Sequence, residues 1–203
     1  MVGLDADPSH SALAKTFVAE RGFDVEILTA DARNSGLPAG SFDLVHARTL
    51  LINVPEPGEV VAEMVRLAKP GGYVASMEPD TEHVLCYPPN AAFTRLCEIF
   101  PLAASRNGAD PEMGRRVPEL LRNAGLEDVG VEVRTQSYPA GHSRRTIRLD
   151  LVLSMRPQIV EMGIATDSEL DELDRSARNH LHDPRTVVMS GLLFLCWGRK
   201  TTG

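Results

Sequence analysis

Apolar segments that end at an acidic residue recur through the first 80 residues of the chain. "VGLD" ends at Asp5, "VEILTAD" ends at Asp31, and "YVASMEPD" contains Glu78 and Asp80 at its end. Helical patterns separate these segments, and strands that alternate with helices predict an α/β fold with a mostly parallel sheet. The four acids are then expected at the carboxyl-end edge of the sheet, where such folds bind ligands.

The remaining elements are expected from periodicity, capping residues and breakers. Asp7 and Pro8 begin the first helix, Gly22 ends it, and Leu13 and Phe17 give it an apolar side. Thr166 and Glu169 form a capping box at the start of a later helix. Strands are expected within 23–32, 42–51, 73–80, 127–139 and 186–200, and helices within 56–69, 114–125, 149–162 and 167–179. A short helix is also expected after the Pro88-Pro89 break, within 90–105.

Length and charge exclude several classes of protein. The 203 residues suit a single domain over 1–203, and the formal net charge of −7 argues against a protein that binds a phosphate backbone. Arg144, Arg145 and Arg148 form the only local basic cluster, which we interpret as a solvated face. The apolar run "VVMSGLLFLCWG" is too short to span a membrane.

Cysteine usage indicates the compartment. Cys86, Cys97 and Cys196 lack metal-ligand spacing, and no secretory signal precedes them. An odd number of thiols without such a signal predicts reduced cysteines in the cytoplasm, and no metal site is expected.

Three stretches of this chain resemble the class I S-adenosylmethionine-dependent methyltransferases. They are "VGLDADPS", "LTADARNSGLPAGSFDLVHARTLLINVPEP" and "LAKPGGYVASMEPD", which together occupy about the first 80 residues. The resemblance implies a Rossmann-like three-layer sandwich with family strand order 3-2-1-4-5-7-6, the seventh strand being antiparallel. Residues 1–80 would form the cofactor-binding half, and 81–118 and 139–185 would be variable segments on the substrate side.

The same resemblance implies where S-adenosylmethionine would lie. Asp5 would accept hydrogen bonds from the ribose hydroxyls, and Ala6 would pack on the adenine. Asp31 and the backbone N–H of Ala32 would contact the polar edge of the adenine. Two further residues at the end of the next strand would lie near the methionine end of the cofactor, namely Ala47 and Arg48.

The reaction implied is direct displacement at the sulfonium methyl, which requires alignment more than catalytic side chains. The aromatic and apolar content of the variable segments predicts a small, partly apolar acceptor. A general base is needed only if the acceptor must lose a proton, and the catalytic residue is unknown. The weak candidates for this base are His46, Glu78, Asp80, His83 and His142.

One feature of the family is missing from the chain. Family members begin with a strand, a glycine-rich loop and a helix, but no two of the sixteen glycines here are two positions apart. The absent strand is central in the family sheet, so its loss would leave a gap of roughly 10 Å. We therefore expect an N-terminally truncated form in which Val2–Leu4 and Leu44–Ala47 flank an open strand position. Upstream coding sequence should then contain an apolar run, an acid and spaced glycines.

Other interpretations remain open at this stage. Exposed strand edges would permit a homodimer or strand exchange. A non-catalytic binding or partner subunit could retain the fold without the cofactor loop. An oxidoreductase with a nicotinamide cofactor would also use Asp5, but it gives the "ADARNSGLPAGSFDLV" block no role.

Overall fold

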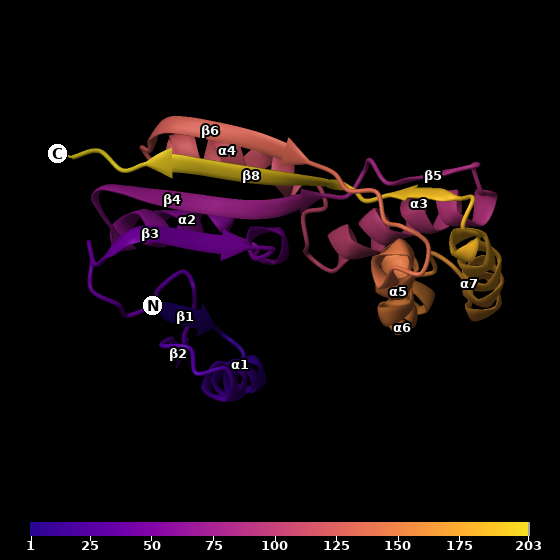
Figure 1. Cartoon of the computed structure of the whole chain (residues 1–203), viewed down its shortest axis with the longest axis horizontal. Coiled ribbons are helices and arrows are strands. Elements are labelled where there is room, and N and C mark those ends of the chain that lie inside the picture. Colours follow the sequence, from indigo (N-terminus) through magenta and orange to yellow (C-terminus); the bar gives the residue numbers. More distant parts are fainter. Residues whose placement is uncertain (203) are drawn as a thin grey trace.

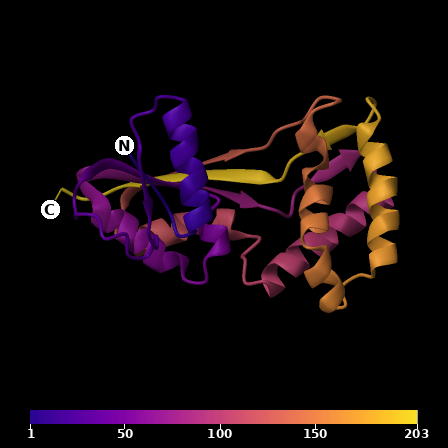
Figure 2. The same ribbon diagram turned by 90° about the horizontal axis from the view of Figure 1, so that it is seen from below.

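The computed structural model describes residues 1–202, which form two lobes with separate buried cores (Figure 1). One lobe contains the long strands, and the other is mostly helical. Figure 2 shows the two lobes side by side along the long axis of the molecule. Among the described residues, no helix combines the length and apolarity that crossing a membrane requires.

The chain begins with a strand, a helix and a second strand. They are β1 (Val2–Asp5), α1 (Pro8–Glu20) and β2 (Glu26–Thr29), and β1 pairs in parallel with β2. The Asp7 carboxylate caps α1, because its Oδ1 accepts a hydrogen bond from the Ser9 backbone N–H at 2.6 Å. These three elements match their sequence predictions.

The second sheet has four strands in the order β3–β4–β8–β6. β3 (Phe42–Arg48) runs parallel to β4 (Ala68–Asp80), whereas β8 (Leu192–Arg199) runs antiparallel to both β4 and β6 (Glu127–Arg134). The α/β Rossmann-like class expected from the sequence is confirmed. Within residues 1–202, however, β1 and β2 form a sheet of their own and no backbone ladder joins them to β3.

Two helices cover one face of this four-stranded sheet (Figure 2). They are α2 (Pro57–Leu67) and α4 (Met113–Asn123). Their buried faces follow from helical spacing, since Val60 and Met64 lie one turn apart, as do Val117 and Leu121. A 3₁₀ turn, η1 (Leu51–Asn53), which the sequence did not predict, completes this core.

The opposite face of the same sheet is open to solvent. Leu44, Tyr73 and Trp197 come from three adjacent strands, and their side chains are 58%, 45% and 38% exposed. On the apolar side of α1, Leu13 and Phe17 are 69% and 50% exposed, and Val18 is half-buried. The main packing partners of α1 are β2 and β1, the short strands beside it, and not the larger sheet.

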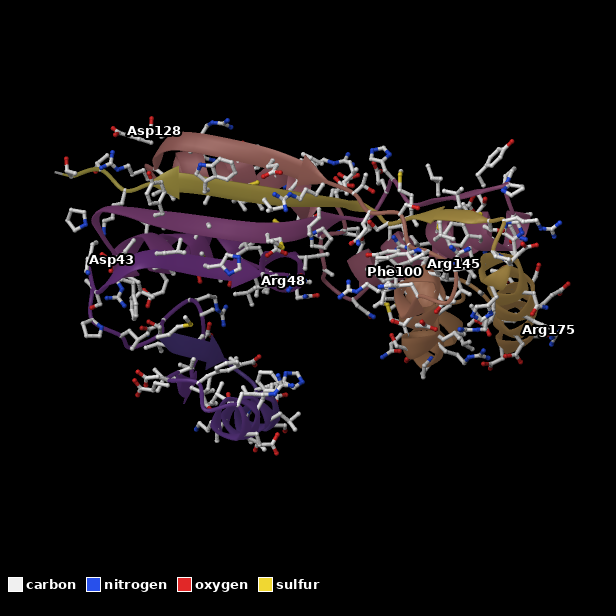
Figure 3. All side chains as sticks on the ribbon, in the orientation of Figure 1. Asp43, Arg48, Phe100, Asp128, Arg145 and Arg175 are labelled. Carbon is white, nitrogen blue, oxygen red and sulfur yellow. The ribbon has the colours of Figure 1, made fainter. Side chains whose placement is uncertain are left out.

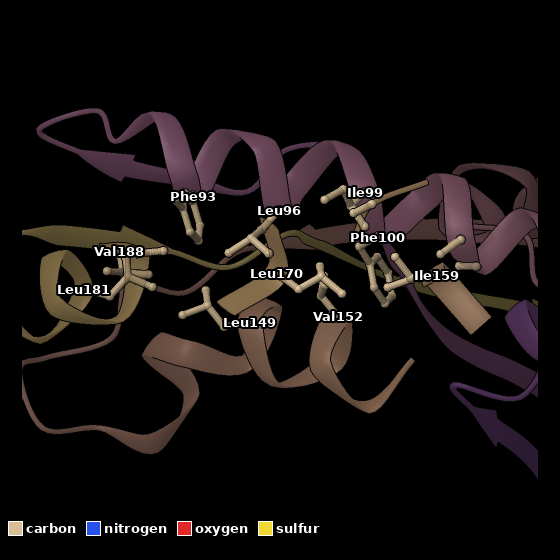
Figure 4. Packing of buried hydrophobic residues seen from close by; sticks show 14 residues of the cluster. Phe93, Leu96, Ile99, Phe100, Leu149, Val152, Ile159, Leu170, Leu181 and Val188 are labelled. Carbon is tan, nitrogen blue, oxygen red and sulfur yellow. The ribbon is translucent and has the colours of Figure 1, made fainter. Parts of the chain in front are cut away.

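The second lobe is built around one long helix, α3, which is longer than the sequence predicted. Figure 4 shows how its side chains Leu96 and Ile99 pack against Leu149, Val152 and a neighbouring helix. The elements of this lobe are β5 (Leu85–Tyr87), α3 (Ala91–Arg106), η2 (Ser143–Thr146), α5 (Ile147–Ser154), α6 (Arg156–Glu161), α7 (Asp167–His182) and β7 (Val187–Met189).

Two sequence predictions in this part of the chain need correction. The helix expected over 149–162 is two helices, because Pro157 cannot donate the backbone hydrogen bond that would continue α5. The strand expected over 186–200 is also divided, into β7 and β8. Gly191 lies at the break, where a Cβ atom would come within 2.8 Å of the Asp80 carbonyl oxygen.

Candidate functional site

A groove separates the first pair of strands from the larger sheet. It has a volume of about 200 Å³ and is lined by Val2, Gly3 and Leu4 of β1 and by Leu44 to Ala47 of β3. From α2, the apolar side chains of Val60, Met64 and Leu67 also line it, together with Glu63. The sequence prediction that these two segments flank an open strand position therefore agrees with the described residues.

Asp5 lies at the carboxyl end of β1, beside this groove. Its Oδ1 accepts a hydrogen bond from the Asp7 backbone N–H at 2.8 Å, and its Oδ2 lies 3.8 Å from His10 Nδ1. The Asp5 side chain is 48% exposed, so Oδ2 is available to a further donor. Ala6 follows in the exposed turn before α1.

Asp31 and Ala32 lie at the neighbouring strand end, after β2. The Arg33 guanidinium donates to both Asp31 oxygens, and this lowers the pKa of Asp31 to about 2. Arg33 also contacts Glu56 Oε2 at 2.9 Å, which ties the loop to the start of α2. Asp31 is therefore held ionised, and Ala32 lines the groove.

The last two residues of β3 line two different hollows. Ala47 is buried and lines the groove, whereas Arg48 is exposed and lines a second cleft toward the helical lobe. Thr49 follows with a φ of 51°, which a β-branched residue rarely adopts. This strained turn begins the segment that leads to η1.

The carboxylate of Glu78 is engaged by backbone groups of the same lobe. Its side chain is fully buried, and its two oxygens accept backbone hydrogen bonds from Leu50, Leu51 and Ile52 at 3.0, 3.1 and 3.3 Å. Burial raises the pKa of Glu78. The carboxylate holds the first turn of η1, an element that comes directly after Thr49.

Asp80 is also occupied by a structural partner. Its carboxylate is fully buried and receives two hydrogen bonds from the Arg115 guanidinium, one of them at 3.0 Å to Oδ1. Arg115 also contacts Glu82 at 2.7 Å. This ion pair connects the end of β4 to α4.

The three candidate histidines lie in different surroundings. His46 lines the groove, and His83 is exposed beyond the end of β4. His142 stacks on Tyr138 at 4.8 Å between ring centroids, and its Nδ1 accepts from the Arg144 backbone N–H at 3.1 Å. Within residues 1–202, no group of three or more His, Cys, Asp or Glu side chains could hold a metal ion.

The second cleft contains residues that sequence reasoning did not select. Arg134, Thr135 and Gln136 follow the alternating residues of β6, and Ser190 precedes β8. Thr135 Oγ1 donates to the Ser190 carbonyl oxygen at 2.9 Å, which joins the segment after β6 to the segment before β8. The polar run after an alternating strand was the signal that could have indicated them.

The comparisons with known proteins agree with this architecture. Residues 1–76 match the model of a family described as "Methyltransferase domain". The N-methyltransferase tcpN of Claviceps purpurea (strain 20.1) is 27% identical over 80% of this chain and 61% of its own length. The demethylmenaquinone methyltransferase of Anoxybacillus flavithermus is 38% identical over 69% of this chain and 65% of its own length. The chain thus spans less than two thirds of these relatives.

Solved structures share the fold. A methyltransferase-like protein from Bacillus halodurans C-125 superposes with a TM-score of 0.64 at 18% identity, over 99% of this chain and 83% of that chain. Phosphoethanolamine N-methyltransferase 2 of Haemonchus contortus, solved with S-adenosyl-L-methionine, gives a TM-score of 0.56 at 16% identity. The match covers 98% of this chain and 43% of that chain.

Proposed function

Because this chain belongs to the class I S-adenosylmethionine-dependent methyltransferases, we propose that it takes part in methyl transfer to a small, partly apolar acceptor. The observation that carries the proposal is the groove between β1 and β3. Asp5 and Ala47 lie at the carboxyl ends of β1 and β3, which flank it, and Asp31 follows β2, the strand paired with β1. A ligand that bridges two strand ends at such an edge is the usual arrangement in open α/β sheets.

The residues present fit the nucleoside end of the cofactor. Asp5 Oδ2 is available to ribose hydroxyls, and an ionised carboxylate can accept two donors. Ala6 would pack on the adenine, while Asp31 and the Ala32 backbone N–H would contact its polar edge. When bound, S-adenosylmethionine supplies the electrophilic methyl group.

The residues present fit the methionine end of S-adenosylmethionine less well than its nucleoside end. Ala47 and Arg48 lie at the end of β3, but the groove beside them is mainly apolar and no glycine-rich loop occurs in the sequence. A close approach of backbone to the cofactor requires such glycines. These residues alone therefore do not account for the position of the reactive methyl group.

We propose that a strand from outside the 203 residues completes the groove. β1 and β3 point in the same direction in Figure 1, and each leaves one backbone edge unpaired among the described residues. Strands that are hydrogen-bonded lie about 4.8 Å apart, so one inserted parallel strand could pair with both edges. The strand could come from a longer form of the chain or from a second copy.

A non-catalytic binding or partner subunit is the second candidate. The engagement of Asp31 by Arg33 favours it, because the carboxylate is already satisfied in the free chain.

Three free cysteines also support a reducing compartment such as the cytoplasm for either function.

Calorimetric titration with S-adenosylhomocysteine separates the two functions. We expect weak or no binding by the 203 residues alone, and stronger binding by a form that supplies the strand proposed for the groove. Asp5→Ala should weaken binding by about 1.5–3 kcal/mol. Asp31→Ala should have a smaller effect on binding. Asp24, an exposed residue between α1 and β2, is the control, and Asp24→Ala should have no effect. Binding that is absent from every folded form would support the non-catalytic function.

A further inference from the structure

The second cleft lies where the sheet meets the helical lobe. It has a volume of about 560 Å³, and residues of β3, β4, β6 and β8 line it together with the connection into η2. Figure 3 shows Arg48 at the carboxyl end of β3. The cleft therefore lies at the same end of β3 as the proposed methyl-transfer site, in the direction of the variable segments.

The charge in this cleft has one sign. Its lining contains the side chains of Arg48, Arg134 and Arg144 and no carboxylate. Arg134 is neutralised by Glu132, whose Oε1 accepts from its Nε at 2.8 Å. Two guanidinium groups then remain uncompensated in a chain whose net charge is −7.

Most arginines of the described chain are engaged by carboxylates, carbonyl oxygens or aromatic rings. The side chains of Arg48 and Arg144 have none of these contacts within residues 1–202. Only Arg122 and Arg175 share this property, and both are exposed on helices away from the cleft. Two of these four partnerless guanidinium groups thus line the same concave surface.

The wall that carries Arg144 is firmly anchored. The neighbouring Arg145 is buried and donates to the Leu181 and Tyr138 carbonyl oxygens, both at 2.7 Å. Arg148 donates to the Thr81 carbonyl oxygen at 2.9 Å and stacks over the Phe100 ring. The basic cluster seen in the sequence therefore divides: two members hold the wall, and Arg144 is presented to the cleft.

We infer that the cleft binds an anionic group of the methyl acceptor, a carboxylate or a phosphate monoester, through Arg48 and Arg144. Guanidinium groups bind both anions through paired N–H donors. Met77, Leu193 and Leu195 line the same cleft and suit the apolar part of such an acceptor. The inference rests on the proposed function only for the statement that the ligand is the acceptor; the anion site stands on the charge and shape of the cleft.

Calorimetric titration of the 203-residue chain at low salt tests the site without any reaction. The probes are hexyl phosphate, heptanoate and hexanol, which share a short alkyl chain and differ in charge. We expect one or both anions to bind and hexanol to bind at least tenfold more weakly. The stronger of the two anions identifies the class of acceptor. Equal binding of hexanol, or no binding of either anion, would overturn the inference.

Variants assign the site to the two arginines. Arg48→Gln and Arg144→Gln should each weaken anion binding at least fivefold, whereas the matched controls Arg122→Gln and Arg175→Gln should change it less than twofold. All four side chains are exposed, so the substitutions should leave the fold intact. Circular dichroism verifies this. A comparable loss in the controls would indicate binding to the surface in general and contradict the assignment.

Titration of the same variants with S-adenosylhomocysteine separates this inference from the proposed function. If Arg48→Gln weakens S-adenosylhomocysteine binding and leaves hexyl phosphate and heptanoate binding unchanged, Arg48 serves the cofactor carboxylate and the inference fails. If no form binds S-adenosylhomocysteine while anion binding follows Arg48 and Arg144, the proposed function fails and the anion site stands.

Discussion

Leu4 of β1 and Leu44 of β3 line the same groove, yet no backbone hydrogen bond joins their strands within residues 1–202. Both strands therefore present unpaired N–H and C=O groups to the groove. An unpaired strand edge beside apolar surface is a template for pairing with another chain.

We expect the 203-residue chain to self-associate at micromolar concentrations through this edge and the open face of the sheet. Leu44→Glu places a charge on the β3 edge and should shift sedimentation toward the monomer. Leu102→Glu is the matched control, because Leu102 is 44% exposed on α3 in the other lobe. Analytical ultracentrifugation measures the shift, and an equal effect of both variants would contradict a specific role for the edge.

The hydrogen bonds of Glu78 predict a graded loss of stability. Glu78→Ala removes every acceptor from the backbone N–H groups of Leu50, Leu51 and Ile52, and should lower the free energy of unfolding by about 3 kcal/mol. Glu78→Gln keeps one acceptor oxygen and should cost about 1 kcal/mol. Urea denaturation measures both, and equal costs would show that the carboxylate does not hold η1.

The raised pKa of Glu78 also predicts the direction of a pH effect. In the folded protein this carboxyl group takes up its proton at a higher pH than its ordinary value of 4.5. Its contribution favours folding most below pH 4.5 and is lost as the pH rises through the folded-state pKa. The difference in stability between the native protein and Glu78→Gln should therefore depend on pH across that window. A difference that stays constant there would contradict the raised pKa.

The ion pair between Asp80 and Arg115 should be costly to break from one side. Arg115→Ala removes the guanidinium from a fully buried carboxylate, and because Arg115 itself is 38% exposed we expect a loss of about 1.5–3 kcal/mol at neutral pH. Arg116→Ala is the control, because Arg116 pairs with Asp110 nearer the surface and should cost about 0–1 kcal/mol. Thermal unfolding at pH 7 provides the comparison, and similar losses in both variants would argue against the buried pair.

Two glycines on neighbouring helices should respond to alanine in opposite directions. A Cβ atom at Gly114 would lie 2.8 Å from Phe194 and 2.9 Å from the Glu78 carbonyl oxygen, so Gly114→Ala should destabilise the protein by about 1–3 kcal/mol. Gly58 in the first turn of α2 has no such neighbour within 4 Å, and Gly58→Ala should stabilise it by about 0.5–1 kcal/mol. Denaturation midpoints that move in the same direction would contradict this packing.

Local patterns in the sequence determined most of the elements and the α/β class. Asp7 and Thr166 cap their helices as predicted, since a cap depends on residues two or three positions away. The acids at strand ends were also visible in the sequence, and Asp5 and Asp31 lie at the edge expected for them. The identity of the cofactor followed from the resemblance of the same 80 residues.

Only the tertiary structure decided which of these acids are available to a ligand. Asp80 is neutralised by an arginine 35 positions away, and Glu78 binds backbone groups 26 to 28 positions earlier. The second cleft is likewise a product of the fold, because Arg48 and Arg144 meet only when the helical lobe packs beside the sheet. Periodicity and capping report contacts within a few residues. Contacts between distant segments depend on strand register and lobe packing, which no local pattern encodes.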